Sequence, residues 1–212
     1  MAYDHEEQEQ MAMLKAWWKQ YGNLVTWTLI LALSAYAGWT GWGLWERNQS
    51  TQAALLYDGL EKAAVAKDYA KVQRAAADIQ DRYSRTAYAQ MSGLVAARNA
   101  YDAGDVAAAK SQLQWTIDKG RDEEFRTIAR VRLAGLLADE KKFDDALKVL
   151  SVDASAQFAS MVADRRGDVL ALAQKVDEAR AAYRIALEKS DAKNPARPLI
   201  QIKLDALGSK AG

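Results

Sequence analysis

The sequence contains no cysteine, one histidine and two prolines in 212 residues. Without cysteine the chain has neither a disulfide framework nor a thiolate nucleophile. The single histidine, His5, lies among acidic residues near the N-terminus, where one imidazole makes a poor metal site. Both prolines, Pro195 and Pro198, are near the C-terminus, so the chain before them is free of proline breaks.

The motifs of common enzyme classes are also missing. The sequence has no Gly-rich phosphate loop, no Ser-x-x-Lys and no metal-ligand spacing. Asp164 and Asp168 share a helix face, but we interpret them as a solvated pair offset by Arg165 and Arg166 rather than as an acid and a base. Net charge is +1, with basic and acidic residues interleaved. We therefore expect no catalytic residue, metal, cofactor or nucleic-acid partner.

One stretch lacks charge altogether. Residues 20–45 contain no Asp, Glu, Lys or Arg. As a helix, 24–44 alone would be roughly 30 Å long, the thickness of the hydrocarbon core of a bilayer. Tryptophans, whose rings favour the headgroup level, stand at both ends. The sequence therefore predicts one transmembrane helix over 23–45 in contact with a lipid bilayer, with membrane-interface residues Trp17, Trp18, Trp39, Trp42 and Trp45.

The sequence disfavours three alternatives to a transmembrane helix with this orientation. A buried helix of a soluble domain rarely runs so long without a charge. A cleaved signal peptide is suggested by the small-x-small pattern 35–37, but the acidic leader and the continuing apolar run disfavour it. The opposite orientation is disfavoured because Lys15 and Lys19 precede the span and only Arg47 closely follows it, which by a narrow margin places the N-terminus in the cytoplasm.

The remaining chain is rich in alanine and poor in β-branched runs, so we expect an all-α fold. We expect a new helix after Arg47, capped by Asn48 or Ser50. Four segments then repeat a polar pair, an apolar residue, two residues that are often charged and a small apolar residue. Their last residues lie 37, 37 and 33 residues apart: Val72, Ala109, Ala146 and Ala179. Twelve residues before the last three stand small residues: Ala97, Ala134 and Gly167.

This pattern predicts helical hairpins. The polar pair forms a tight turn, and the small residues meet where the two helices cross. Such a short hairpin cannot bury its apolar face alone, so neighbouring hairpins stack into a solenoid. The pattern resembles the tetratricopeptide repeat, whose usual period is about 34 residues. The alternative is a generic alanine-rich bundle. Pro198 to Leu207 is expected to form a capping helix with Ile202 and Leu207 apolar.

In a tetratricopeptide solenoid the first helix of each pair lines a concave groove. Counting from the phased alanines gives a mostly apolar partner-binding set that suits a hydrophobic helix or an extended apolar segment. The alternative is that Leu94, Ile128 and Val131 are core residues. The predicted groove residues are Tyr57, Met91, Leu94, Arg98, Tyr101, Ile128, Val131 and Met161.

Several segments together carry a family resemblance: 14–23 with its double tryptophan, the tryptophan-rich exit 38–45, 53–57, and 163–168 with 178–187 and 202–207. Through them the whole chain resembles the YfgM family, the single-span, tetratricopeptide-containing ancillary subunits of the SecYEG translocon. The resemblance implies a single-pass protein of the bacterial inner membrane. Residues 1–22 would be a cytoplasmic tail and a helix leading into the membrane, 23–45 the span and 46–212 a periplasmic repeat domain.

The resemblance also implies a function without catalysis. The chain would be a membrane-anchored interaction scaffold at the SecYEG translocon. It would link the translocon to a membrane-anchored, prolyl-isomerase-like periplasmic chaperone for newly exported proteins. The alternative is a single-span regulator whose acidic tail, Asp4 to Glu9, contacts a signalling protein in the cytoplasm.

Overall fold

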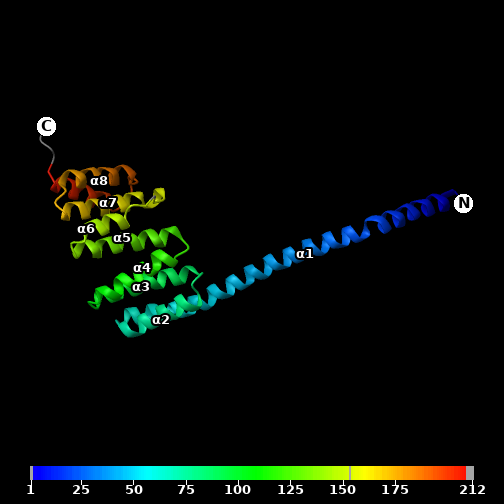
Figure 1. Cartoon of the computed structure of the whole chain (residues 1–212), viewed down its shortest axis with the longest axis horizontal. Helices are drawn as coiled ribbons and strands as arrows, with labels where there is room; N and C mark the ends of the chain where they lie inside the picture. Colours follow the sequence, from blue (N-terminus) through cyan, green and yellow to red (C-terminus); the bar gives the residue numbers. More distant parts are fainter. Residues whose placement is uncertain (1, 153, 209–212) are drawn as a thin grey trace. The chain divides into compact units, whose positions relative to one another are not determined.

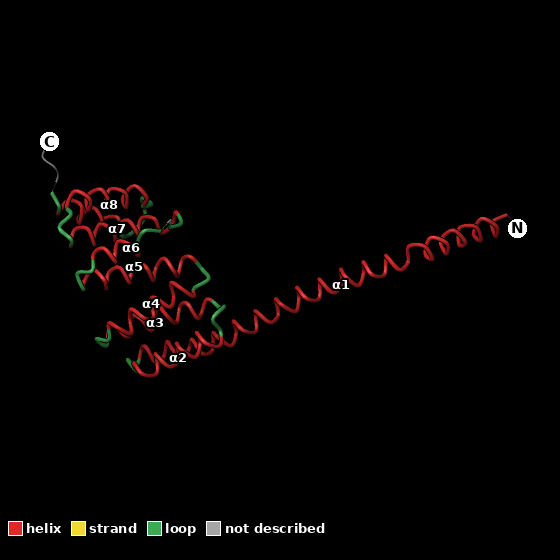
Figure 2. Tube along the Cα trace, in the orientation of Figure 1, coloured by secondary structure: helices red, strands yellow, loops and turns green. Residues whose placement is uncertain are grey.

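The computed structural model describes residues 2–152 and 154–208, with the side chains of 2–8 excluded. The acidic side chains from Asp4 to Glu7 therefore lie outside the described residues. Every regular element in the described part is helical, as the sequence predicts (Figures 1 and 2). The helices are α1 (Ala2–Val65), α2 (Tyr69–Arg82), α3 (Ala87–Asp102), α4 (Val106–Lys119), α5 (Glu123–Asp139), α6 (Phe143–Val149), α7 (Ala156–Leu172), α8 (Val176–Lys189) and α9 (Arg197–Ala206).

The first helix is longer than expected. The chain divides into two compact units, the first ending at residue 49 and the second beginning at residue 50. Helix α1 forms the whole described part of the first unit and contributes residues 50–65 to the second. It begins at Ala2, well before the uncharged stretch 20–45. The prediction of a new helix capped by Asn48 or Ser50 is wrong, because α1 continues through both residues. A capping side chain is needed only where backbone N–H groups lack carbonyl partners, and a continuing helix supplies those carbonyls.

The four predicted turns are all present, and they share one geometry. The first residue of each turn has a positive φ, and two backbone hydrogen bonds close the end of the preceding helix in a Schellman motif. Only the second turn uses glycine, Gly104, for this conformation. The positive-φ residues are Lys67, Gly104, Lys141 and Gln174.

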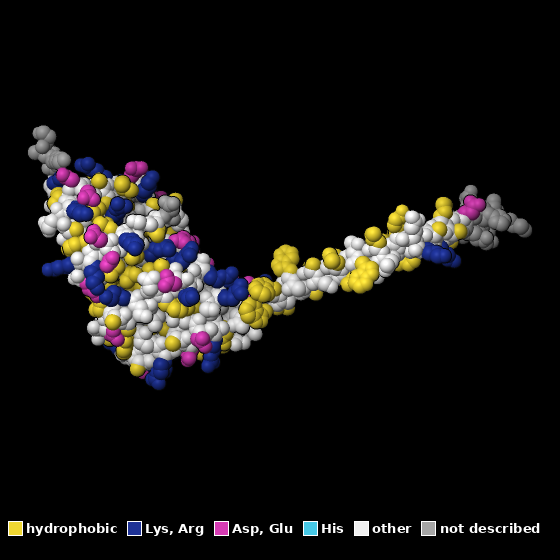
Figure 3. All heavy atoms as spheres, in the orientation of Figure 1, with side chains coloured by type: hydrophobic (Ala, Val, Ile, Leu, Met, Phe, Trp, Pro, Cys, Tyr) yellow, Lys and Arg dark blue, Asp and Glu magenta, His cyan; other side chains and the backbone are white. Residues whose placement is uncertain are grey.

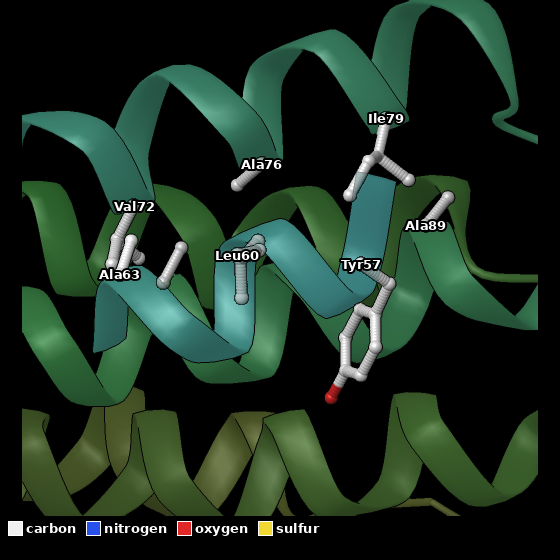
Figure 4. Packing of buried hydrophobic residues seen from close by; sticks show 8 residues of the cluster. Tyr57, Leu60, Ala63, Val72, Ala76, Ile79 and Ala89 are labelled. Atoms are coloured by element: carbon white, nitrogen blue, oxygen red, sulfur yellow. The ribbon is translucent and has the colours of Figure 1, made fainter. Parts of the chain in front are cut away.

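The small residues that follow each turn are at the centre of the packing, which confirms the repeat register. Val72, Ala109, Ala146 and Ala179 are fully buried. Ala134 is also fully buried and belongs to the same cluster as Ala146, between α5, α6 and α7. Figure 4 shows the first crossing, where Leu60 of α1 faces Val72, Ala76 and Ile79 of α2.

The core runs through the second unit as four linked clusters. Each cluster is shared by three successive helices, from α1–α2–α3 to α7–α8–α9, so every hairpin is covered by its neighbour. The predicted cap is present as α9, but its buried residue is Ile200, and Ile202 is exposed. The reason is that α9 begins at Arg197 and turns the face bearing Ile200 and Leu204 toward α8.

Candidate partner-binding groove

Two adjoining hollows lie along the first helices of the hairpins. The larger, of about 470 Å³, is bounded by residues of α1, α3 and α5. The smaller, of about 340 Å³, is bounded by residues of α3, α4, α5 and α7. Arg98 and Arg132 line both hollows, so the two form one continuous groove across the stack.

Five of the eight predicted groove residues lie in this groove. Four of them line the larger hollow: Tyr57, Met91, Leu94 and Arg98. Tyr101 lines the smaller one beside Arg98 and is 47% exposed. The structure therefore brings together the predicted residues of α1 and α3.

The predicted residues of α5 and α7 lie elsewhere. Val131 is buried in the cluster between α5 and α7, and Met161 packs against that cluster. Ile128 packs against the cluster around Leu113 and Leu133. The alternative interpretation, that the residue belongs to the core, is therefore correct for Val131. The face of α5 that carries Val131 packs against the next hairpin. Leu94 is both buried and part of the groove wall.

Tyr57 supplies a neutral hydroxyl to the larger hollow. Its ring stacks at a tilt on Tyr88, with centroids 5.6 Å apart. Figure 4 shows that the hydroxyl points away from α2. Burial, followed by the charge of Glu61 and a hydrogen bond to the Glu61 carboxylate, raises the pKa of Tyr57 to about 12.

Two arginines of the groove, Arg132 and Arg165, were missed by the sequence interpretation, which included only Arg98. Arg132 lies in both hollows and Arg165 in the smaller one. A signal for them exists, because each stands two residues before a phased small residue, Ala134 or Gly167. The first helices of two successive hairpins thus present a guanidinium at the same register position.

The first unit contains an apolar helix whose side chains lie on its surface. Its most apolar window is entirely unburied, and it is long and apolar enough to cross a membrane. Figure 3 shows apolar side chains along the surface of this helix. The predicted interface tryptophans are 44–77% exposed: Trp17, Trp18, Trp39, Trp42 and Trp45. Because water solvates such a surface poorly, the helix requires an apolar environment.

Comparison with known proteins supports the description of the apolar helix and of the repeat domain. A family model described as a tetratricopeptide repeat-like domain matches residues 15–209. A protein of Neisseria gonorrhoeae named ancillary SecYEG translocon subunit is 32% identical over 98% of this chain and 100% of its own length. The chain belongs to this family.

Two other ancillary SecYEG translocon subunits show how far the likeness extends. The Haemophilus influenzae protein is 30% identical over 80% of this chain and 82% of its own. The Escherichia coli protein is 26% identical over 95% of this chain and 96% of its own. The family model spans 15–209, which includes both the apolar helix and the repeats, and the YfgM resemblance is confirmed.

Asp164 and Asp168 make an ion-pair contact that the sequence interpretation did not predict. The Lys203 ammonium of α9 lies 2.8 Å from Asp164 Oδ1 and 2.8 Å from Asp168 Oδ1. Tyr183 donates its hydroxyl to Asp168 at 2.9 Å. The interpretation as a solvated pair is therefore wrong, because both carboxylates are partly buried where the cap docks onto α7.

Within the described ranges, no group of three His, Asp or Glu side chains is placed to hold a metal ion. The groove combines apolar surface with two tyrosines, three guanidinium groups and two carboxylates.

Proposed function

We propose that the chain is a membrane-anchored protein-interaction scaffold at the SecYEG translocon. The observation that carries the proposal is the coexistence, on one chain, of an unburied apolar helix and a stacked repeat domain with an open groove. The names of the relatives supply the assembly, since they are called ancillary SecYEG translocon subunits. A scaffold needs no catalytic residue, because its contribution is to hold two partners near each other.

The second partner in this proposal is a periplasmic chaperone. The wall of the larger hollow carries Met91, Leu94 and Phe125, which suit an apolar helix or an extended apolar segment. In the proposal, a membrane-anchored chaperone related to prolyl isomerases docks there and meets proteins as they leave the translocon. Confinement to one membrane raises the effective concentration of both partners.

The proposed arrangement places residues 1–22 in the cytoplasm, 23–45 in the inner membrane and 46–212 in the periplasm. Lys15 and Lys19 on one side, against Arg47 on the other, support this orientation. The rings of the five interface tryptophans would lie at the two headgroup levels, where the apolar ring is covered and the N–H remains hydrated.

Cysteine labelling tests the orientation, because the chain has no native cysteine. Ser84, in the exposed loop between α2 and α3, is replaced with cysteine, and Ala2 is replaced in a second variant. In intact spheroplasts, a membrane-impermeant maleimide is expected to label Ser84→Cys and to leave Ala2→Cys unlabelled until the membrane is opened. The reverse pattern would refute the orientation, and a mature protein that begins at Gly38, after the small-x-small pattern 35–37, would refute the anchor.

Affinity purification tests the scaffold function. The tagged full-length chain is isolated from inner membranes in a mild detergent, and SecY is measured by immunoblot. SecY is expected to be retained with the chain, whereas an unrelated single-span protein at the same level should retain none.

A further inference from the structure

Three arginines from three successive first helices meet in the smaller hollow. Arg98 comes from α3, Arg132 from α5 and Arg165 from α7. Of the residues that line this hollow, Asp139 alone is a carboxylate. The lining therefore carries an excess of positive charge, although basic and acidic residues are nearly balanced over the whole chain.

The contacts of these arginines leave hydrogen-bond donors unused. Arg98 engages both oxygens of Asp102 through Nε alone, at 2.9 and 2.8 Å, so this pair does not occupy its terminal nitrogens. Arg165 meets Asp168 at 3.4 Å through Nη1, and its buried Nε has no acceptor. Arg132 donates to the carbonyl of Leu94 at 3.3 Å and forms no ion pair with the described residues.

Asp102 offsets the charge of Arg98 and Asp168 that of Arg165, but no ion pair of the described residues offsets Arg132. Burial, followed by the charge of Arg98, lowers the pKa of Arg132. A carboxylate would offset the repulsion and accept several of the unused donors at once. The planar guanidinium fork matches the two oxygens of a carboxylate in particular.

The surroundings indicate that this carboxylate belongs to a polypeptide. Tyr101 and Leu136 flank the arginines in the smaller hollow, and Met91 and Phe125 continue the apolar wall in the larger one. A small free anion would leave this apolar surface uncovered. A peptide segment with an acidic side chain beside apolar ones would cover it and neutralise the charge.

We propose that Arg98, Arg132 and Arg165 bind a glutamate or aspartate side chain of a partner segment whose neighbouring apolar side chains fill the adjoining hollow. The inference rests on the proposed scaffold function, since it names the chemistry of the segment that docks in the groove. The arginines would also make the groove selective. The apolar wall alone would bind many apolar segments, whereas the arginines would favour those that carry an acidic side chain.

Peptide binding to the full-length chain in phosphatidylcholine nanodiscs tests this assignment. The probes are short fluorescein-labelled peptides with the same leucine and tyrosine positions and an amidated C-terminus, one with glutamates and one with glutamines between them. Anisotropy is expected to give a Kd at least about tenfold lower for the glutamate peptide, as for one charge-assisted pair, with a gap that shrinks as salt is raised. Equal Kd values for the two peptides would overturn the proposal.

Variants locate the effect. Arg132→Gln is expected to remove most of the preference for glutamate, and Arg132→Glu to transfer it to a lysine peptide. Arg74→Gln, on the exposed face of α2, is the matched control and should leave the preference unchanged. Calorimetry of each variant checks folding, and Arg165→Gln replaces Arg132→Gln if the latter unfolds. A preference that survives Arg132→Gln, or Arg165→Gln in its place, would refute the role of the arginines.

A further probe separates the two possible sources of a carboxylate. A glutamine peptide with a free C-terminus is expected to bind no better than its amidated form. If it binds as tightly as the glutamate peptide, the hollow recognises chain ends, and the assignment to acidic side chains is wrong. Retention of SecY by the same preparations measures the scaffold function separately, so either hypothesis can fail while the other stands.

Discussion

Replacing Ala146 with arginine is expected to destabilise the repeat domain severely. Ala146 is fully buried between α5, α6 and α7, in the same cluster as Ala134. Overpacking such a site costs about 1–3 kcal/mol, and a buried charge without a partner costs more. A total loss above about 3 kcal/mol would lower the Tm of a domain of this size by roughly 6–12 °C.

Lys148→Ala is the matched control on the same helix. Lys148 is exposed, so its removal should change the Tm by less than about 2 °C. Both variants are compared with the wild type by calorimetry of the full-length protein in detergent. Similar shifts for the two substitutions would count against the repeat register, because the register alone distinguishes residue 146 from residue 148.

Gly167→Ala is expected to destabilise the protein even though alanine is the better helix former. A Cβ at this position would lie 2.5 Å from Cδ1 and Cε1 of Tyr183. The ring cannot yield cheaply, because Tyr183 is buried and its hydroxyl is bonded to Asp168 at 2.9 Å. The expected loss in the free energy of unfolding is about 1–3 kcal/mol.

Gly59→Ala provides the opposite expectation. No atom lies within 4 Å of a Cβ at Gly59 in α1, so helix propensity should act alone and stabilise by up to about 1 kcal/mol. Urea unfolding of the two variants should therefore give midpoint shifts of opposite sign. A stabilising shift for Gly167→Ala would show that helix α8 can move away from α7 at low cost.

The turns and crossings could be predicted because each depends on a local residue pattern that the chain repeats. A polar pair followed by a small apolar residue specifies a turn and then a close crossing, and Val72, Ala109, Ala146 and Ala179 are all fully buried. The Schellman bonds follow from the same pattern, since each requires only one residue with positive φ after a helix.

The ends of helices were harder to predict, since they depend on what the neighbouring chain does. Asn48 and Ser50 are good capping residues, yet α1 continues past them because no glycine or proline interrupts 44–58. Helix α6 ends early, at Val149, where Ser151 and Val152 are weak helix formers and Ser151 bonds back to the carbonyl of Leu147.

The groove was predicted in part for a geometric reason. Counting residues along the first helix of a hairpin identifies the face that points to the groove. It does not show how much of that face the next hairpin buries. On α3, Met91, Leu94 and Arg98 line the larger hollow. On α5 the next hairpin covers Val131, and Arg132 beside it reaches the groove instead. A difference of one residue in register decides between core and surface.

Retention of SecY by the full-length chain tests the central claim most directly, when wild type, Lys148→Ala and Ala146→Arg are purified side by side at equal levels. A scaffold that acts through its folded repeats predicts equal retention by wild type and Lys148→Ala, and a large loss for Ala146→Arg at a temperature above its Tm and below that of the wild type. If no variant retains SecY, or if Ala146→Arg retains as much as the wild type under those conditions, the repeat domain is not what joins this chain to the translocon.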